Sequence, residues 1–320
     1  MSKRLVAVSG ATGQQGGAVV DALLRLGGFK VRGLTRDPSS AAATELGAKG
    51  VEVVKADFDD LESLKAAFKG ADAAFGVTDV KAVGFDPTKE VRHGKNLVDA
   101  AKATGVGHFV WSTLEDTREL TKGVLEPITG TYTVPHFDAK AEVGEYLKQE
   151  LPGKGTLLLT SIFNENILPG GPMPPNKQPD GSYVLVMPLG NAKTAWCATA
   201  DIGNVAAAVI TAGPEKFGDK TVPVAGDHVT WAEVGEAFGR VTGKKVVIVT
   251  PSVEEWAKQA MGYGAPEVVA KDMANMFIYY EKVGILGLRS VEETKAVYPD
   301  VLTVEAWLNK HKAAFVEALA

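Results

Sequence analysis

A glycine-rich turn near the start of the chain limits the possible folds more than any other feature of the sequence. The stretch VAVSGATGQQGGAVVDALL places Gly10, Gly13 and Gly16 after a short apolar run and at the start of a segment with helical periodicity. Gly10 permits a tight turn, Gly13 lets backbone approach a ligand, and Gly16 lets helix and strand pack closely. The helix start also offers unpaired N–H groups and a positive dipole end. The stretch predicts a loop for the pyrophosphate of a dinucleotide, the alternative being a structural glycine turn without a ligand.

The first half of the chain alternates strands and helices. Short Val-rich runs separated by longer stretches of helical period are typical of parallel strands joined by crossover helices. The expected strands are Leu5–Ser9, Lys30–Thr35, Val51–Ala56, Ala73–Val77, His108–Ser112 and Thr156–Ile162. The expected helices begin near Gln14, Ser40, Asp60, Thr88 and His136. We expect an α/β fold, with a Rossmann-type doubly wound parallel sheet and a smaller mixed C-terminal α/β domain.

The sequence changes in character after Asn166. The stretch LPGGPMPPNKQPDGSY predicts a long loop, because proline lacks a backbone donor and glycine adds conformational freedom. Short strands and helices follow, with the strands expected at Tyr183–Met187, Val222–Ala225 and Val246–Val249 and the helices from near Ala200, Thr230, Ser252, Pro266 and Thr303. We expect a Rossmann domain over residues 1–166, with later additions from about 195–225, and a smaller substrate or partner domain over residues 167–320.

Two charged residues after the second expected strand bear on the choice of nucleotide. Arg36 and Asp37 stand where a Rossmann fold reads the adenosine ribose. A guanidinium suits a 2′-phosphate, whereas a carboxylate suits a free ribose hydroxyl. Since neighbouring side chains point to opposite sides of an extended chain, we favour Arg36, and therefore NADP(H) over NAD(H). The alternatives are that Asp37 faces the ligand, or that Arg36 pairs with Asp37 or is a solvated charge.

Asp57 and Phe58 follow the third expected strand, where an adenine would lie. The carboxylate would accept a hydrogen bond from the exocyclic amine, and the ring would cover the base. The capped start of the next helix explains the aspartates of ADFDD equally well, and the residues alone leave both interpretations open.

Five motifs together resemble the NmrA-like family, an atypical branch of the short-chain dehydrogenase/reductases. They are EVRHGKNLVDAA, HFDAKAEVGEYL, FNENIL, DIGNVAAAV and LTVEAWLNKHKAAF, and the resemblance covers nearly the full length. It implies a protein that binds NADP(H). Some members of the family resemble redox sensors in the cytosol and nucleus. In such a sensor, cofactor occupancy changes the conformation, the binding of partners and the association state, which includes a possible homodimer.

The resemblance also implies roles for individual residues. Lys140 would touch the nicotinamide ribose, and Arg36 and Ser40 would meet the 2′-phosphate. The other implied cofactor contacts are Gly10, Ala11, Thr12, Gly13, Gln14, Gln15 and Gly16 in the phosphate loop, Asp57 and Phe58 at the adenine, Thr78, Asp79 and Val80 at the ribose chain, the cationic Arg92, and Phe163, Asn164 and Asn166 at the nicotinamide. The loop Lys81–Asp86 and the proline-rich loop depart from the family, so the resemblance implies no partner or substrate contacts there.

Whether the chain is a catalyst depends on Lys140. In ordinary short-chain reductases a tyrosine four residues before this lysine gives and takes the proton, but here that position is His136 and the nearest upstream tyrosine is Tyr132. Relatives that resemble isoflavone reductase also lack the tyrosine and use the lysine itself as acid and base. A histidine can relay a proton near neutral pH, although near a helix start it is more often a cap or a packed ring.

Ser112 and Thr113 end the fifth expected strand, where the superfamily keeps a hydroxyl for a substrate carbonyl. A strand end beside a loop is also commonly Ser or Thr, and both interpretations remain open. The five histidines are scattered without metal-binding spacing, so we expect no metal.

Composition excludes several other classes of function. A formal net charge of −5 and no long basic run disfavour direct nucleic-acid binding. The apolar run at the N-terminus is too short for a signal peptide or a membrane span. A single cysteine, Cys197, excludes an internal disulfide and fits a reducing compartment such as the cytosol.

Two functions fit these observations. The first is a non-catalytic, NADP(H)-responsive regulatory protein with a protein partner, in which the loops Lys81–Asp86 and Pro169–Tyr183 are the candidates for movement. The second is an NADPH-dependent reductase of a quinone, an imine or a small conjugated carbonyl, with Lys140 as the acid. The missing tyrosine favours the first.

Overall fold

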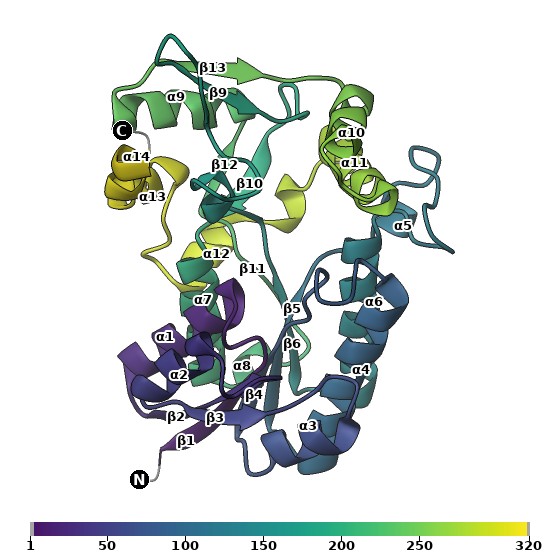
Figure 1. Ribbon diagram of the computed structural model, residues 1–320. Helices are drawn as coiled ribbons and strands as arrows, with labels where there is room; N and C mark the ends of the chain where they lie inside the picture. Colours follow the sequence, from purple (N-terminus) through teal and green to yellow (C-terminus); the bar gives the residue numbers. More distant parts are fainter. Residues whose placement is uncertain (1–2, 319–320) are drawn as a thin grey trace. The chain divides into compact units, whose positions relative to one another are not determined.

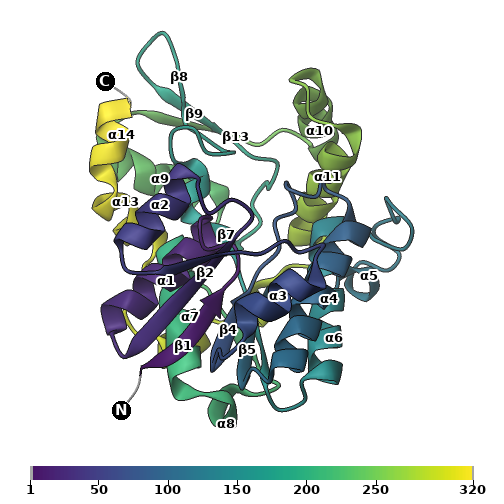
Figure 2. The same cartoon turned by 60° about the horizontal axis from the view of Figure 1, so that its bottom comes forward.

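The computed structural model describes residues 3–318, which divide into two compact units (Figures 1 and 2). The first unit consists of the chain up to Asp116 together with Pro135–Thr160 and Thr199–Val222. The second consists of Thr117–Val134, Ser161–Ala198 and the chain from Pro223 onward. The chain therefore leaves the first unit at Thr160, before the expected boundary at residue 166, and an earlier excursion over Thr117–Val134 also belongs to the second unit.

A seven-stranded sheet forms the middle of the first unit. Its order is β11-β6-β5-β4-β1-β2-β3, and the neighbouring pairs from β6 to β3 are parallel. The strands are β1 (Arg4–Val8), β2 (Phe29–Thr35), β3 (Glu52–Lys55), β4 (Ala73–Gly76), β5 (His108–Thr113), β6 (Gly155–Leu159) and β11 (Thr221–Pro223). This order confirms the expected doubly wound Rossmann-type sheet. The order reverses between β1 and β4, where folds of this kind bind their ligands beyond the carboxyl ends of the strands.

Helices cover both faces of this sheet (Figures 1 and 2). One face carries α1 (Gln14–Leu26), α2 (Ala41–Ala48) and α7 (Thr199–Ala212), and the short α8 (Pro214–Phe217) follows α7. The other face carries α3 (Leu61–Phe68), α4 (Pro87–Thr104) and α6 (Pro135–Glu150). Glycine lets the helices pack closely: a Cβ on Gly203 in α7 would lie 2.2 Å from the carbonyl oxygen of Ala18 in α1. On the other face Phe68, Leu97 and Leu147 are fully buried in a shared apolar core.

The helices α2, α3 and α4 begin where the sequence offers side-chain caps. Ser40, Asp60 and Asp86 accept hydrogen bonds from the first backbone N–H groups of α2, α3 and α4, and Pro87 follows Asp86 at a position that needs no N–H. The start of α3 thus agrees with the expected cap at Asp60.

The second unit contains two small sheets and several helices. The sheets have the orders β12-β10-β7 and β13-β9-β8. Their strands are β7 (Ile162–Phe163), β8 (Asn176–Lys177), β9 (Tyr183–Val186), β10 (Thr194–Cys197), β12 (Asp227–Val229) and β13 (Val246–Val249). The helices are α5 (Thr117–Leu120), α9 (Trp231–Thr242), α10 (Val253–Gly262), α11 (Glu267–Lys282), α12 (Val291–Val297), α13 (Val304–Lys310) and α14 (Lys312–Ala318), with 3-10 turns η1 (Asn164–Ile167) and η2 (Leu286–Leu288).

Two sequence expectations need correction here. The expected strand Thr156–Ile162 is two strands, because β6 pairs with β5 in the large sheet whereas β7 pairs with β10 in a small one. The proline-rich segment is not entirely a loop, since β8 forms inside it at Asn176–Lys177, between the prolines, and pairs with β9.

Over residues 3–318, no helix combines the length and the apolar character that crossing a bilayer requires.

Candidate functional site

The glycine turn after β1 is built as the sequence predicts. Gly10 has a φ of +58°, in the left-handed region that favours glycine. A Cβ on Gly16 would lie 2.2 Å from the carbonyl oxygen of Gly10, so no larger residue fits there without moving the backbone. The side chain of Ser9 then ties this turn to the end of β4, since its hydroxyl donates to the carbonyl of Val77 (3.0 Å) and accepts from the Val77 N–H (2.8 Å).

The start of α1 differs from those of α2, α3 and α4. Gly13 occupies the capping position, no side chain caps the helix, and its first turn has no acidic residue. Thr12, Gly13 and Gln14 are exposed. The first amides of α1 are therefore open to an external anion, whereas those of α2, α3 and α4 are partly satisfied by side chains.

At the end of β2 the two neighbouring charges have different surroundings. The Asp37 carboxylate accepts hydrogen bonds from the hydroxyl (2.6 Å) and the N–H (2.9 Å) of Ser39, and these bonds lower the pKa of Asp37. Arg36 is exposed and forms no ion pair with any side chain in the described part of the protein. Ser40 caps α2 and donates its hydroxyl proton to the carbonyl of Asp37. The guanidinium is thus available to a ligand, whereas the Asp37 carboxylate is held by Ser39 at Oδ1.

The segment after β3 lies beside Arg36, because the N–H of Ala56 bonds to the carbonyl of Thr35. The Asp57 carboxylate is exposed and accepts from the N–H of Asp59 (3.0 Å), while Asp60 caps α3. The capping interpretation thus holds for Asp60, and Asp57 remains a candidate adenine contact.

Arg92 is engaged by a carboxylate that the sequence analysis did not single out. Its Nη2 lies 2.5 Å from Oδ1 of Asp59, and Nε2 of His93 lies 3.1 Å from the same oxygen. Arg92 and His93 together lower the pKa of Asp59. The ring of His93 also packs edge-on against Phe58, with centroids 5.8 Å apart. A cofactor contact by Arg92 would have to compete with this ion pair.

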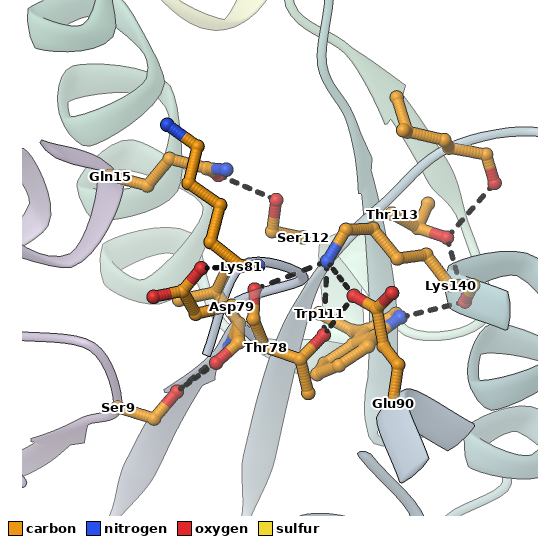
Figure 3. Close-up of polar contacts among 12 residues, drawn as sticks. Ser9, Gln15, Thr78, Asp79, Lys81, Glu90, Trp111, Ser112, Thr113 and Lys140 are labelled. Atoms are coloured by element: carbon orange, nitrogen blue, oxygen red, sulfur yellow. Dashed lines mark hydrogen bonds and ion pairs between the residues drawn. The ribbon is translucent and has the colours of Figure 1, made fainter. Parts of the chain in front are cut away.

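Lys140 and Thr78, both expected at the cofactor, meet in the structure around Glu90 (Figure 3). Nζ of Lys140 lies 2.6 Å from Oε1 of Glu90, 2.9 Å from Oγ1 of Thr78 and 3.2 Å from the Thr78 carbonyl. Glu90 is fully buried, and the side chain of Lys140 is 10% exposed. The Thr78 hydroxyl donates to the same Glu90 oxygen at 2.7 Å.

Sequence reasoning missed Glu90, although the sequence contained a signal. Glu90, Gly94, Leu97 and Ala101 follow one another at helical spacing and all four are buried on one face of α4. A single carboxylate at the start of an otherwise apolar stripe needs a buried cation or donor.

Side chains at the end of β5 form hydrogen bonds to the phosphate loop and to the backbone of Lys140 (Figure 3). The hydroxyl of Ser112 donates to Oε1 of Gln15 at 2.6 Å, which connects two residues predicted for the site. Thr113 Oγ1 (3.1 Å) and the indole N–H of Trp111 (3.0 Å) both donate to the carbonyl of Lys140. Thr113 therefore holds the backbone of Lys140, and Ser112 is the hydroxyl that remains a candidate for substrate.

No tyrosine takes the place of the missing acid on α6. His136 is the second residue of the helix and is half-buried. Its ring lies edge-on to the ring of Phe137, with the two centroids 4.7 Å apart. The first tyrosine after Lys140 is Tyr146, whose hydroxyl donates to Asp99 at 2.7 Å. This hydrogen bond raises the pKa of Tyr146 to about 12, so its phenol is a poor acid near neutral pH.

The predicted nicotinamide contacts belong to the second unit. Asn164 in η1 is fully buried, and neither atom of its side-chain amide has a hydrogen-bond partner among residues 3–318. Phe163 and Asn166 are half-buried, and the carbonyl of Asn166 accepts from the N–H of Met173. A buried amide with an unpaired donor and acceptor suits a ligand that offers both, as a carboxamide does.

Within the described chain, no three His, Cys, Asp or Glu side chains are grouped as metal binding would require. The thiol of Cys197 is buried in β10.

These features fit a dinucleotide with an extra phosphate. The open amides of α1 suit the pyrophosphate, and Arg36 is free for a phosphate on the ribose. Lys140 presents an ammonium at the carboxyl end of the sheet, where such ligands bind.

Comparison with known proteins agrees with this fold. A sequence profile described as the NmrA-like family matches residues 2–308. An NmrA-like family domain-containing oxidoreductase of Aspergillus campestris is 31% identical over 336 aligned positions, which cover 99% of this chain and 94% of that protein.

Solved structures share the architecture at lower identity. NmrA, a negative transcriptional regulator solved in complex with NADP, superimposes with a TM-score of 0.81 at 21% identity, covering 99% of this chain and 98% of the other. An NADPH-dependent quinone oxidoreductase of Escherichia coli, solved with NADPH, gives 0.73 at 23% identity, covering 96% and 99%. The match of the family profile to nearly the whole sequence shows that this chain belongs to the NmrA-like family.

Proposed function

We propose that this protein binds NADP(H), in preference to NAD(H), at the carboxyl end of the large sheet. The observation that carries the proposal is the pairing of an uncapped helix start at Gly13 with an unpaired guanidinium at Arg36. The helix amides would bind the pyrophosphate, and Arg36 would bind the 2′-phosphate. Asp37 is less suited to read a ribose hydroxyl, because both hydrogen bonds from Ser39 already fall on one of its carboxylate oxygens, Oδ1.

The other site residues have roles that follow from their contacts. Gln15, which accepts from Ser112, would hold the phosphate loop against the end of β5. Lys140 would place its positive charge beside the nicotinamide ribose. When bound, NADPH supplies a hydride donor. These residues orient it, and none of them needs to transfer a proton for binding.

Of the two functions, we infer that a regulatory NADP(H)-responsive protein fits the site best. A proton donor must release and regain its proton, but the Lys140 ammonium is held by a buried carboxylate, and Tyr146 is tied to Asp99. The partner is then another protein, and a homodimer is one form that the response can take. The single buried cysteine suits a cytosolic protein, and residence in the nucleus is part of the regulatory proposal.

The loop between β4 and α4 is the segment we propose to respond to the cofactor. It contains the site residue Thr78 and leads into the helix that carries Glu90. Gly84 and Phe85 both have positive φ, +66° and +60°, and for a phenylalanine this conformation is strained. Strain next to a ligand site supports a segment with two accessible conformations.

One observation favours the second candidate, an NADPH-dependent reductase of quinones, imines or conjugated carbonyls. Lys140 is present and fixed, and the hydroxyl of the buried Ser112 lies at the end of β5, where a substrate carbonyl would be bound. In this function Lys140 would be the acid.

A turnover experiment separates the two. NADPH consumption would be followed with a panel of quinones, imines and enones, beside a cofactor-binding titration on the same protein. The regulatory proposal predicts binding of NADPH without consumption, and a partner retained differently by the NADPH-bound and free protein. Consumption of NADPH that disappears in Lys140→Arg, while NADPH binding persists, would establish the reductase instead.

A further inference from the structure

The approach of two helices brings Glu90 and Lys140 together. A Cβ on Gly94 of α4 would lie 2.5 Å from Cγ2 of Val143 on α6, so the helices are in close contact at this point. Glu90 lies one turn before Gly94, and Lys140 lies about one turn before Val143, so their side chains meet just beyond the contact.

The ammonium of Lys140 is fully occupied by the protein. It has three protons, and the structure provides three acceptors: Oε1 of Glu90, and the hydroxyl and the carbonyl of Thr78. The backbone of Lys140 is fixed as well, because Trp111 and Thr113 both donate to its carbonyl. Hydrogen bonds therefore fix both the backbone and the ammonium of Lys140, which is unusual for a long flexible side chain.

The carboxylate depends on the ammonium in turn. Glu90 is fully buried, and its second oxygen, Oε2, has no hydrogen-bond partner in the described part of the chain. A buried carboxylate without a compensating cation is strongly disfavoured. Lys140 is the cation that Glu90 contacts, and a neutral amine there would leave the charge of Glu90 uncompensated.

Other charged and titratable residues are found near the pair in the sequence, on the elements packed against it. They are Lys89, Arg92 and His93 on α4, Asp79 and Lys81 after β4, Glu115 and Asp116 after β5, and His136 and Asp138 on α6. Arg92 and His93 are directed to Asp59, and the carboxylate of Asp79 accepts from the N–H of Lys81. In the part of the chain described, the ammonium of Lys140 bonds to Thr78 and Glu90 alone.

We propose that Glu90 is a positioning residue that keeps Lys140 fixed and charged, so that the lysine serves the site as a stationary cation and not as a proton shuttle. The cofactor part of this inference rests on the proposed binding of NADP(H). The effect on Lys140 itself does not, and it is testable on the free protein.

The direct test is an NMR titration of Lys140 in protein labelled on the lysine side chains, with the signal assigned by its loss in Lys140→Arg. Glu90→Gln keeps the size of the side chain and removes its charge. The proposal predicts that Lys140 loses its proton at a pH lower by about one unit or more in this variant than in the wild type. The matched control is Glu142→Gln, which removes a half-exposed carboxylate that pairs with Lys95 across the same two helices at 2.9 Å.

An unchanged titration of Lys140 in Glu90→Gln, or an equal shift in Glu142→Gln, would overturn the proposal. If Glu90→Gln does not fold, Glu90→Asp takes its place, since it keeps the charge but withdraws it by one methylene. The expected shift then has the same direction and is smaller, and its absence in Glu90→Asp would also overturn the proposal.

A second titration addresses the cofactor. NADPH affinity, measured from pH 7 to 9.5, should fall more in Glu90→Gln than in the wild type, because the Lys140 ammonium contributes to binding and the variant loses it at a lower pH. Glu90→Asp should restore part of the wild-type affinity. Wild-type protein that binds no NADPH would contradict the proposed function alone, whereas normal NADPH affinity at pH 9.5 in folded Glu90→Gln would contradict the role of Glu90 at the cofactor.

Discussion

At the scale of single residues, His108 couples stability to pH. It begins β5 with its ring buried, and its Nε2 lies 2.7 Å from the hydroxyl of Thr156, which itself donates to the carbonyl of Phe217. Nε2 is therefore the protonated nitrogen, and Nδ1 is buried without a partner among the described residues. Burial lowers the pKa of His108 to about 4, because protonation would place a charged donor at Nδ1 with nothing to accept from it.

The first prediction concerns acid stability. The unfolded chain gains a proton at His108 near pH 6.5, whereas the folded protein gains it only near pH 4. The stabilising contribution is thus complete above pH 6.5 and is lost as the pH falls towards 4, by up to about 3 kcal/mol. Urea unfolding at pH 7, 6 and 5 should show this loss in the wild type and a flatter dependence in His108→Gln. Parallel profiles for the two proteins would refute it.

The second prediction concerns the buried pair. Lys140→Met leaves Glu90 buried without its cation, and the free energy of unfolding should fall by about 3–5 kcal/mol. The double variant Glu90→Gln/Lys140→Met should recover most of this loss, as a double-mutant cycle by chemical denaturation would measure. Additive losses in the double variant would mean that the two side chains are not coupled. An activity test with a neutral substitution of Lys140 therefore needs this stability control.

Residue-level expectations succeeded where local chemistry determines the outcome. Asp60 caps α3, as its position before a helical stripe predicts, and Gly10 takes the positive φ that its turn requires. The Glu90–Lys140 pair was missed because its two residues are fifty positions apart in the sequence, and only the packing of α4 on α6 brings them together.

At the scale of elements, two neighbouring glycines at the start of α1 differ in how much room they leave for a side chain. Gly16 lies against the Gly10 carbonyl, where a Cβ would be 2.2 Å away, whereas a Cβ on the adjacent Gly17 would be 3.4 Å from the carbonyl of Ala11. The first distance requires the backbone to move, and the second is an ordinary contact.

The third prediction compares these two glycines. Gly16→Ala should displace the start of α1 and weaken NADPH binding by at least about tenfold, because the amides would no longer converge on the pyrophosphate. Gly17→Ala should bind NADPH as the wild type does and should be equally or more stable, by up to about 1 kcal/mol, since alanine favours a helix interior. Thermal unfolding and a fluorescence titration of NADPH would measure both. A similar loss of binding in the two variants would argue against the proposed role of the turn.

Strands and helices of the first unit were largely predictable, because Val-rich runs and helical stripes alternate regularly there. The expected starts at Gln14 and Thr88 lie at or next to the observed starts of α1 and α4. The run from Thr156 to Ile162 misled, because Thr160 and Ser161 fit a strand and no glycine or proline marks the point after Leu159 where the chain passes from one sheet to another. Pairing partners, which local sequence does not encode, determine that break.

At the scale of the whole molecule, the order of the strands determines which residues can form one site. The reversal between β1 and β4 places the glycine turn, Thr78 and the end of β5 at the same edge of the sheet. The fold class followed from the alternation of elements alone. The division into two units was harder to predict, because Thr117–Val134 leaves the first unit and Thr199–Val222 returns to it. Sequence reasoning treats a domain as continuous unless composition marks the break.

Isothermal titration calorimetry of NADPH and NADH, on the wild type and on Arg36→Ala, would show whether Arg36 selects the phosphorylated nucleotide. We expect the wild type to bind NADPH at least about tenfold more tightly than NADH, a difference of ~1.4 kcal/mol or more. Arg36→Ala should lose this preference while its affinity for NADH stays near that of the wild type. Equal affinities of the wild type for the two nucleotides, or no binding of either, would refute the proposed NADP(H) site.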